Sequence, residues 1–474
     1  MISQMFNLSS LILRLVEEAT NFNEIEKKIV KLVFELGRWM LQAVFTYLDW
    51  KLSKQREKGL RSIGVRERNV LTRLGTVKVK RRYYRDREGN TRFLLDEALG
   101  WERGGTAATP CMEAQALKMC SDVSYRRSTK HLSFFLAEDV SHSFLHRLVQ
   151  EGGRERAQEK RDLAENLFRW GALPPSEKRE AERLFFEADG CVIPLQREKR
   201  KKHELKVAIS YEGWLRVGED KWATHGKRAC LSAADGGSFL REWSADLATV
   251  YDHSKVGEVI WSSDGASWLR KGPDLFSCTY AQVDRFHLSR SLTRALGFSR
   301  ETFRLLALAR EGKAPEVIRA LEGHLEKATE KGKRKRIREA ISYISSLAAW
   351  LTDYRRNLQA REDDRSPGAI EGNVDKLVAD RFKKRGMSWR PSGANHMCQI
   401  IELKENGELF SFVSQRRKAH PEVTEVAIAS LRKEVRRDPE AWLKKNMPLL
   451  QTRSGDPWVK DVLMGLAGYA GIAS

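Results

Sequence analysis

Three acidic residues, Asp189, Asp264 and Glu371, are placed where their carboxylates could hold metal ions. Transfer of a phosphodiester at neutral pH needs an activated nucleophilic oxygen and a stabilised leaving oxygen, and two divalent ions about 3.5–4 Å apart provide both. Mg²⁺ prefers oxygen ligands, and Mn²⁺ accepts the same donors. The three carboxylates therefore predict a two-ion site, provided that the fold brings them together.

The position of each acid has a functional and an ordinary interpretation. Asp189 lies within the apolar strand predicted over residues 184–193, where an unpaired charge is costly. Asp264 follows the strand predicted over 258–262, at the end where ligand-binding residues gather in α/β sheets. Glu371 opens a helix with one apolar face. The alternatives are an aspartate on an edge strand, a turn aspartate before glycine, and a glutamate stabilising a helix N-terminus.

The elements that must position these acids begin after residue 183. Strands are predicted over residues 184–193, 206–211, 228–233, 258–262 and 278–283. A helix over 239–251 precedes the fourth strand, and another begins near Phe286. Strand signals are absent from 295 to 365, where a helical insertion is expected, and a helix then runs from 370 to 384. By analogy, this order is that of the ribonuclease H-like fold, so an α+β or α/β multidomain chain with a mixed five-stranded core sheet is predicted.

The remaining segments predict further domains. We expect a helical region over 1–64, a β-hairpin and helix pair over 65–153, a charged helical linker over 154–183, a catalytic core over 184–294 and 366–404, an insertion over 295–365, and a mainly helical tail over 405–474. The hairpin is placed between Val65 and Phe93, with a turn at residues 88–90. More than one domain is also what 474 residues predict.

Two helices, over 124–136 and 141–150, are joined by a three-residue link. The pair is compatible with a helix-turn-helix whose second helix presents His142, His146 and Arg147 to a DNA groove. An ordinary helical hairpin is the equally weighted alternative.

The composition points to a polyanionic partner. Lysine and arginine total 85 against 64 acidic residues, which gives a net charge of +21. DNA, RNA and membrane surfaces all attract such a charge, so it does not choose among them. The longest apolar stretch, residues 29–50, is interrupted by Lys31, Glu35 and Arg38, so no membrane span is expected.

The N-terminus and the cysteines indicate the compartment. Residues 1–18 lack a basic leader and a small-residue cleavage site, so a cytoplasmic, nucleoid-associated protein is expected. The six cysteines are scattered without a CxxC pair, which argues against a zinc site and against a disulfide framework. No GxxxxGK[ST] loop occurs, so no nucleotide cofactor is expected.

Several short segments carry a family resemblance over residues 65 to about 400. They are Leu71–Gly75, Arg81–Tyr84, Leu94–Gly100, Ala188–Gly190, Tyr211–Trp214, Ser263–Trp268, Asp284–His287, Glu371–Asn373 and Lys384–Trp389. Together they resemble the DDE transposases of bacterial insertion sequences, specifically the mutator-like ISLre-type lineage. Beyond about residue 405 the resemblance fades.

The resemblance implies that Asp189, Asp264 and Glu371 are the metal-binding triad of a DNA transposase. It further implies that Asp284 and His287 form the Asp-x-x-His signature of related mutator-like enzymes, with auxiliary roles. His287 would contact DNA or orient Asp264, although a lone histidine at a helix start is more often structural. Double-stranded DNA is then the partner, and bringing two transposon ends together implies a homodimer or a larger assembly.

Basic clusters near the acids are candidates for DNA binding. The first lies in the turn after the strand that carries Asp189, and the second follows the helix that carries Glu371. They comprise Arg197, Lys199, Arg200, Lys201, Lys202, Lys383, Lys384, Arg385, Trp389 and Arg390. Packed basic residues suit phosphates rather than bases. Trp389 would stack on an unpaired base, although core packing is the commoner role of tryptophan.

The expected reaction is hydrolysis of a phosphodiester at the transposon end, followed by attack of the freed 3′-hydroxyl on target DNA. One alternative is another ribonuclease H-like nuclease, such as a junction resolvase, which cuts without joining. The other is a non-catalytic DNA-binding protein derived from a transposase.

Overall fold

The computed structural model describes residues 16–17, 19–101, 107–359, 361, 364–416 and 421–446. Two compact units divide the chain, one formed by residues 1–148 with 409–474 and the other by residues 149–408. The C-terminal segment thus belongs with the N-terminal region, whereas the sequence predicted a separate tail. Residues 417–420 and 447–474 of that tail lie outside the described residues.

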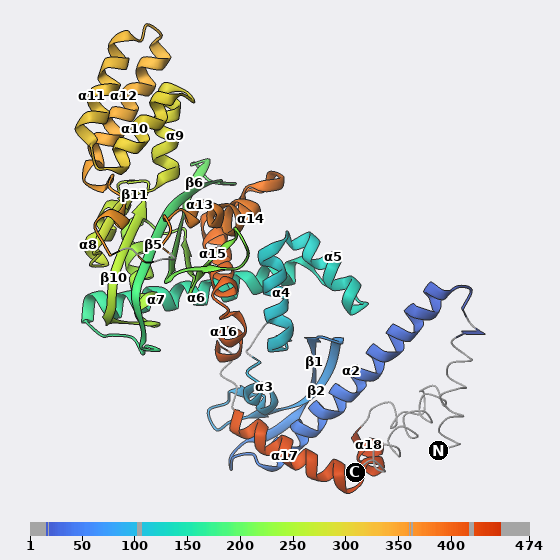
Figure 1. The fold of residues 1–474 in the computed structure, drawn as a ribbon. Coiled ribbons are helices and arrows are strands. Elements are labelled where there is room, and N and C mark those ends of the chain that lie inside the picture. Colours follow the sequence, from blue (N-terminus) through green and yellow to red (C-terminus); the bar gives the residue numbers. More distant parts are fainter. Residues whose placement is uncertain are drawn as a thin grey trace. The chain divides into compact units, whose positions relative to one another are not determined.

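The first unit is built on a long helix and a small sheet (Figure 1). Helix α2 (Phe22–Lys54) packs on a sheet of order β3-β2-β1-β4, formed by β1 (Arg61–Thr72), β2 (Gly75–Arg85), β3 (Thr91–Arg92) and β4 (Ala107–Ala108). Its other helices are α3 (Leu94–Ala98), α4 (Pro110–Asp122), α5 (Tyr125–Leu136), α16 (Leu409–Arg416), α17 (Pro421–Arg437) and α18 (Pro439–Asn446). Phe45, Val70, Val77 and Trp101 lie in its core.

The predicted β-hairpin exists, but its main turn lies elsewhere. β1 and β2 pair antiparallel from Arg61↔Arg85 to Thr72↔Gly75, so the chain reverses after Thr72. The predicted turn at 88–90 only joins β2 to the two-residue strand β3. Gly75, with φ +92°, supplies the left-handed backbone at the true turn.

The second helix of the predicted pair is much longer than expected. Ser124 caps α5, because its side chain accepts the N–H of Arg127. Helix α6 runs without interruption from His142 to Trp170 and includes most of the predicted linker. Gly153 lies inside α6, and a Cβ there would lie 2.3 Å from the carbonyl oxygen of His396. This glycine therefore permits close helix packing and does not end the helix.

The second unit contains a mixed five-stranded sheet of order β11-β10-β5-β6-β9. Its strands are β5 (Arg179–Pro194), β6 (Lys202–Tyr211), β9 (Arg228–Ser232), β10 (Tyr251–Ser263) and β11 (Tyr280–Val283). β5 pairs antiparallel with β6 and parallel with β10, while β10 and β11 are also parallel. All five predicted strands are confirmed. The hairpin of β7 (Gly213–Arg216) and β8 (Trp222–His225) was not anticipated.

Aromatic side chains fill the core beside this sheet. Phe186, Trp243, Trp261 and Phe276 form one cluster, in which Trp243 comes from helix α7 (Gly236–Ala248). Helix α15 (Pro391–Glu405) packs on β9. The short helix α8 (Gly272–Leu275) precedes β11.

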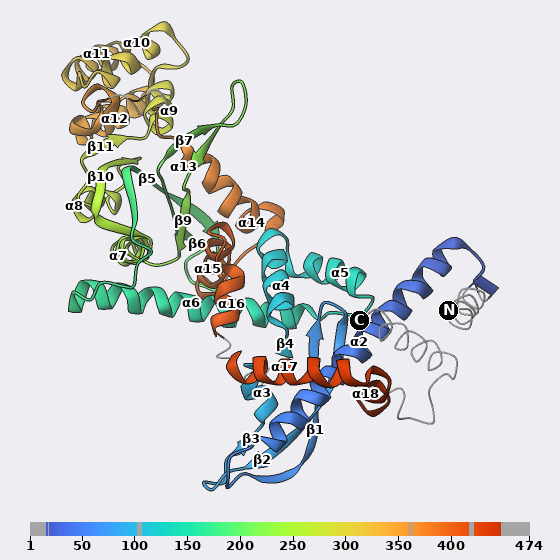
Figure 2. The same ribbon diagram turned by 60° about the horizontal axis from the view of Figure 1, so that its bottom comes forward.

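The predicted helical insertion is confirmed. α9 (Arg285–Leu296), α10 (Arg300–Arg310), α11 (Ala314–Lys327) and α12 (Lys331–Ser346) share a core of their own and form the bundle beside β11 in Figure 1. The chain then returns to the sheet at α13 (Ala369–Asn373), continues through a π-helical segment (Val374–Ala379) into α14 (Asp380–Phe382), and reaches a 3₁₀ turn at Lys384–Gly386. Figure 2 gives a second view. No helix in the described part of the chain is both long and apolar enough to cross a membrane.

Candidate metal centre

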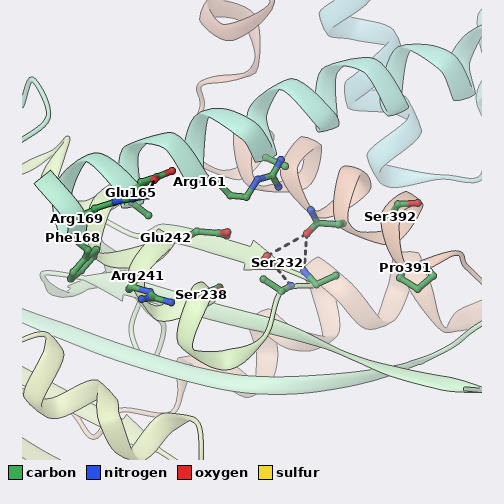
Figure 3. Close-up of a pocket in the computed structure, with 15 residues that line it drawn as sticks. Arg161, Glu165, Phe168, Arg169, Ser232, Ser238, Arg241, Glu242, Pro391 and Ser392 are labelled. Carbon is green, nitrogen blue, oxygen red and sulfur yellow. Dashed lines mark hydrogen bonds and ion pairs between the residues drawn. The ribbon is translucent and has the colours of Figure 1, made fainter.

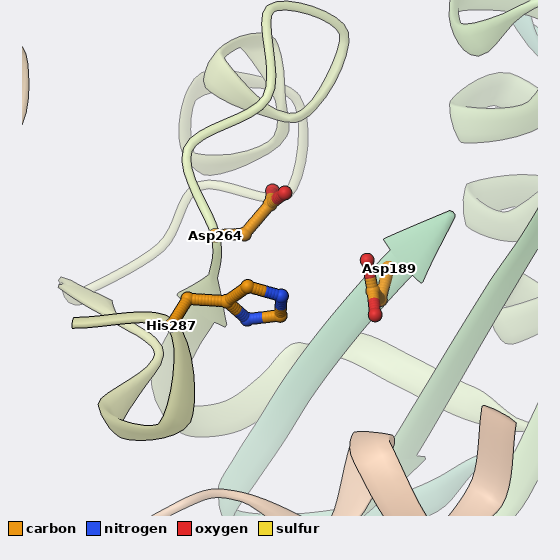
Figure 4. Close-up of side chains that lie close together, drawn as sticks. All are labelled: Asp189, Asp264 and His287. Carbon is orange, nitrogen blue, oxygen red and sulfur yellow. The ribbon is translucent and has the colours of Figure 1, made fainter. Parts of the chain in front are cut away.

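Asp189, Asp264 and His287 converge beside the five-stranded sheet. One potential ligand atom from each lies within 4.8 Å of the others, and all three side chains are half-buried. Figure 4 shows the imidazole of His287 pointing toward Asp189, with the Asp264 carboxylate beside it. Residues separated by up to 98 positions are thus brought into one group, which is what a metal site requires.

Asp189 is positioned by the central strand β5. The backbone N–H of Gly190 donates to its carboxylate at 2.6 Å. A Cβ on Gly190 would lie 2.3 Å from the Glu204 carboxylate on β6, so the Glu204 side chain occupies the space that Gly190 leaves open.

Asp264 follows β10 directly, and β10 is the parallel neighbour of β5. Its carboxylate accepts a hydrogen bond from the N–H of Ala266 at 2.9 Å, which closes a turn through Gly265. Gly265 has φ +79°, and a Cβ there would lie 2.5 Å from the Leu347 side chain. Gly265 is thus needed for the turn that positions the Asp264 carboxylate, because only glycine readily adopts this backbone conformation in the space left by Leu347.

His287 is held by Asp284, as the Asp-x-x-His spacing allows. Asp284 caps α9 by accepting the N–H of His287 at 3.0 Å, and it contacts the His287 Nδ1 at 3.1 Å. The hydrogen bond to Asp284 raises the pKa of His287 against the opposing effect of burial, and Asp189 and Asp264 act in the same direction. A carboxylate on one ring nitrogen fixes the ring so that the other nitrogen can serve as a ligand.

Glu371 is exposed on α13 and does not belong to the group of three. Its charge nevertheless reaches the site. Burial raises the pKa of Asp189 to about 6, and the carboxylates of Asp264 and Glu371 act in the same direction, against the Gly190 hydrogen bond and the His287 imidazole. Carboxylates that raise the pKa of a neighbouring carboxyl in this way are suited to share a divalent cation, which prefers oxygen ligands.

A fourth acid, Glu187, anchors the helix that carries Glu371. It is fully buried on β5, where its carboxylate accepts the Tyr211 hydroxyl at 2.5 Å and the N–H groups of Ala369 at 3.2 Å and Ile370 at 3.1 Å. These N–H groups belong to the first turn of α13, where backbone donors lack helical partners. Glu187 therefore fixes α13 against β5, two residues along the strand from Asp189.

A second contact holds the same returning segment. Arg183 on β5 is buried and binds both oxygens of Asp364 at 2.6 and 2.7 Å, as well as Glu258. Neither Glu187 nor Arg183 was expected from the sequence to support the site. The available signal was strand alternation, since residues 183, 187 and 189 lie on the same side of one strand.

We predict that Glu187→Ala weakens metal binding without abolishing the fold. Loss of the α13 anchor lets Glu371 move, so Mn²⁺ affinity measured by isothermal titration should fall about 10–100-fold. Glu187→Gln keeps one carbonyl oxygen as an acceptor, so its Mn²⁺ affinity should lie between that of Glu187→Ala and that of the unchanged protein. Thermal unfolding controls for loss of structure. Unchanged Mn²⁺ affinity in a folded Glu187→Ala protein would mean that this anchor does not position the site.

The two predicted basic clusters meet at one edge of the second unit. The N–H of Gln196 donates to the carbonyl of Trp389 at 2.9 Å, and the N–H of Trp389 donates to the carbonyl of Pro194 at 3.1 Å. The turn residues Arg197, Lys199, Arg200, Lys201 and Lys202 are exposed, as are Lys383, Lys384 and Arg390. Lys384 is paired with Asp380 and Asp375, while the side chain of Arg385 lies outside the described residues.

Trp389 packs in the core, which the sequence favoured over stacking on a base. Its side chain is 8% exposed, packs on Phe382 with ring centroids 4.7 Å apart, and donates its indole N–H to the Phe382 carbonyl at 3.1 Å. A tryptophan whose ring and N–H are both engaged in the core has no free face for a base. His142, His146 and Arg147 are exposed at the start of α6.

Two of the cavities in the described part of the second unit differ in their lining. One, of about 370 Å³, is lined by Asp264 and His287 together with side chains of α9 and α12. Another, of about 710 Å³, lies between α6, α7 and α15 and contains none of the candidate ligands (Figure 3). The candidate ligands Asp264 and His287 thus line the smaller of these two cavities.

Comparison with known proteins places the chain in a family. A model of the uncharacterised protein family UPF0236 matches residues 15–419. A UPF0236 protein of Caldanaerobacter subterraneus subsp. tengcongensis is 22% identical over 401 residues, covering 83% of this chain and 80% of that protein.

Two further relatives are similar over comparable lengths. Another UPF0236 protein of that bacterium, whose name joins eleven separate designations, is 21% identical over 413 residues, covering 83% of this chain and 80% of its own. A Streptococcus gallolyticus relative, named as the UPF0236 protein in the vanSb 3′ region, is 24% identical over 409 residues, covering 83% of this chain and 85% of its own.

Proposed function

The chain belongs to the UPF0236 family, and from this premise we propose that it is a DDE-type DNA transposase. The observation that carries the proposal is the convergence of Asp189, Asp264 and His287, with Glu371 acting on Asp189. In this reading the second unit is a ribonuclease H-like catalytic core, and the basic surface at residues 197–202 and 383–390 holds DNA.

The strand order supports a ribonuclease H-like core. Three neighbouring strands of the sheet, β5, β6 and β9, are antiparallel, with the β7–β8 hairpin inserted between β6 and β9. Strand β10 then returns parallel to β5, with β11 beside it. The first acid lies on the central strand and the second at the carboxyl end of its parallel neighbour. In open α/β sheets, ligands bind outside the carboxyl ends of the strands. The end of β10 that carries Asp264 is therefore the expected place for a reacting phosphate.

The donor set supports divalent metal chemistry. Asp189, Asp264 and Glu371 would hold Mg²⁺ or Mn²⁺, and His287 would complete or support the set. Such ions supply the Lewis-acid chemistry that phosphodiester transfer requires. The residues of the chain orient that site: Asp284 fixes the His287 ring, Gly265 shapes the turn under Asp264, and Glu187 anchors the helix of Glu371.

The name of one relative supports mobility of the gene. Eleven designations joined in one protein name fit a sequence present in several copies, as transposition would leave. A transposase must hold two DNA ends at once, so we propose a homodimer or larger assembly that acts on DNA in the cell interior.

The test uses the DNA that flanks the gene. The purified protein, incubated with labelled DNA spanning each element end, should cut that DNA and join the freed 3′ end to a second duplex, which gel electrophoresis resolves. Both steps should need Mg²⁺ or Mn²⁺ and stop when EDTA removes it, because the carboxylates alone cannot stabilise the leaving oxygen. Cutting without joining would indicate a nuclease instead, and no cutting with either ion would contradict the proposal.

A further inference from the structure

The cavity beside the acidic group is a basic groove between helices α9 and α12. One face of α9 supplies His287, Arg290, Ser291 and Arg294, and one face of α12 supplies Arg336, Glu339 and Tyr343. These positions follow spacings of three, four and seven, so each set lies along a single helix face. Asp264 belongs to the same lining, which makes the groove continuous with the metal centre.

The three arginines are available to a ligand. Arg290 and Arg294 are exposed and Arg336 is half-buried. Within the described residues, none of the three guanidinium groups forms an ion pair with a carboxylate. Glu339 also lines the groove, but it lies 3.9 Å from Lys335 of its own helix. The groove therefore carries three arginines and His287 against two acidic side chains, Asp264 and Glu339.

Tyr343 provides an independent sign of a ligand. Its hydroxyl oxygen is buried, yet no hydrogen-bond partner lies within reach among the described residues. Burial raises the pKa of Tyr343, and the nearby charges of Asp264 and Asp284 act in the same direction, so the hydroxyl stays a neutral donor. A buried donor without a partner is costly, and an oxygen of a bound ligand would satisfy it.

The order of the side chains gives the groove a direction. Arg290 and Arg294 follow His287 by three and seven residues, which places them about 4.5 and 10.5 Å farther along the axis of α9. One strand of duplex DNA carries a phosphate about every 3.4 Å of axis. A row of about 10.5 Å, beginning at the candidate metal centre, therefore spans about three phosphate steps.

We propose that the groove between α9 and α12 binds the backbone phosphates of the DNA strand that continues from the reacting phosphate. The proposal rests on the transposase function and adds where that strand leaves the site. Arg290, Arg294 and Arg336 pair with phosphate oxygens, and the Tyr343 hydroxyl donates to the one nearest Asp264. Because guanidinium groups bind phosphate without reading bases, the contact fixes strand position and not sequence.

The test measures binding of a fluorescein-labelled 30-base-pair duplex with a single-stranded 3′ extension, by anisotropy over a range of salt concentrations. The variant Arg290→Ala/Arg294→Ala/Arg336→Ala should lower the slope of log affinity against log salt by about 2–3, since each phosphate contact contributes roughly 0.9. Tyr343→Phe should weaken binding about 3–10-fold, as loss of one hydrogen bond predicts.

The matched control is Arg300→Ala/Arg319→Ala/Arg338→Ala, which removes three exposed arginines of the same helical bundle outside the groove. Its salt slope should stay that of the unchanged protein. An unchanged slope in the groove variant, or an equal fall in the control, would overturn the proposal.

The outcomes also distinguish failure of the groove proposal from failure of the transposase proposal. A lowered slope in a protein that never cuts DNA would support the groove and contradict the transposase. Normal cutting with an unchanged slope would support the transposase and contradict the groove.

Discussion

Replacing Asp264 by asparagine should abolish strand cleavage while leaving DNA binding intact. The substitution keeps the size of the side chain and the hydrogen bond from Ala266, but removes the charge that a divalent ion needs. Metal-ion catalysis contributes several kcal/mol to the transition state. Loss of about 4 kcal/mol corresponds to roughly a thousandfold slower cleavage. The same loss is expected for Asp189→Asn.

Single-turnover cleavage in Mg²⁺ measures the effect, and anisotropy on the same DNA measures binding. Glu322→Gln is the matched control, because it removes one exposed carboxylate from the helical bundle, away from the site. An Asp264→Asn protein that cuts at the normal rate would show that these acids are not the catalytic ligands. A protein that neither binds nor cuts would point to a structural role for Asp264.

Replacing Lys160 by methionine should destabilise the second unit more than the loss of a surface ion pair would. The Lys160 ammonium on α6 lies 2.7 Å from Glu402 on α15, and both side chains are 0% exposed. Glu402 also accepts the N–H of Leu231 on β9 at 2.7 Å, so the pair ties two helices to the edge of the sheet. Removing Lys160 leaves the buried Glu402 charge with Arg156, 3.7 Å away, as its remaining cation. Breaking a buried pair in this way costs about 3–5 kcal/mol.

Urea unfolding followed by tryptophan fluorescence measures this loss. Lys255→Met is the matched control, since Lys255 pairs with Glu180 at side-chain exposures of 54% and 62% and should cost no more than about 1 kcal/mol. Adding Glu402→Gln to Lys160→Met should restore part of the lost free energy of unfolding, because the buried charge of Glu402 is removed as well. Equal effects of the two single lysine variants would show that the buried pair contributes no more than a surface pair.

The predicted strands and insertion follow from local patterns, and the structure places them where the sequence predicts. The alternation around Asp189 and the apolar run before Asp264 required no knowledge of distant residues. Local patterns did not decide features that depend on distant contacts. The helix predicted over 141–150 continues to Trp170 as α6, and Gly153 within it faces the backbone of His396. Trp389 could stack on a base or pack in the core, and its contact with Phe382 selects the second.

By itself the sequence determined which strands carry acids, that a helical insertion separates Asp264 from Glu371, and that the chain is strongly basic. Only the tertiary structure decided that His287 joins Asp189 and Asp264, that Glu187 anchors the helix of Glu371, and that α9 and α12 share a groove. Hydrophobic periodicity is a property of neighbouring residues and can be read along the chain. Burial, ion pairing and metal geometry depend on partners such as Glu187 and Ile370, which lie 183 positions apart and meet only in the folded protein.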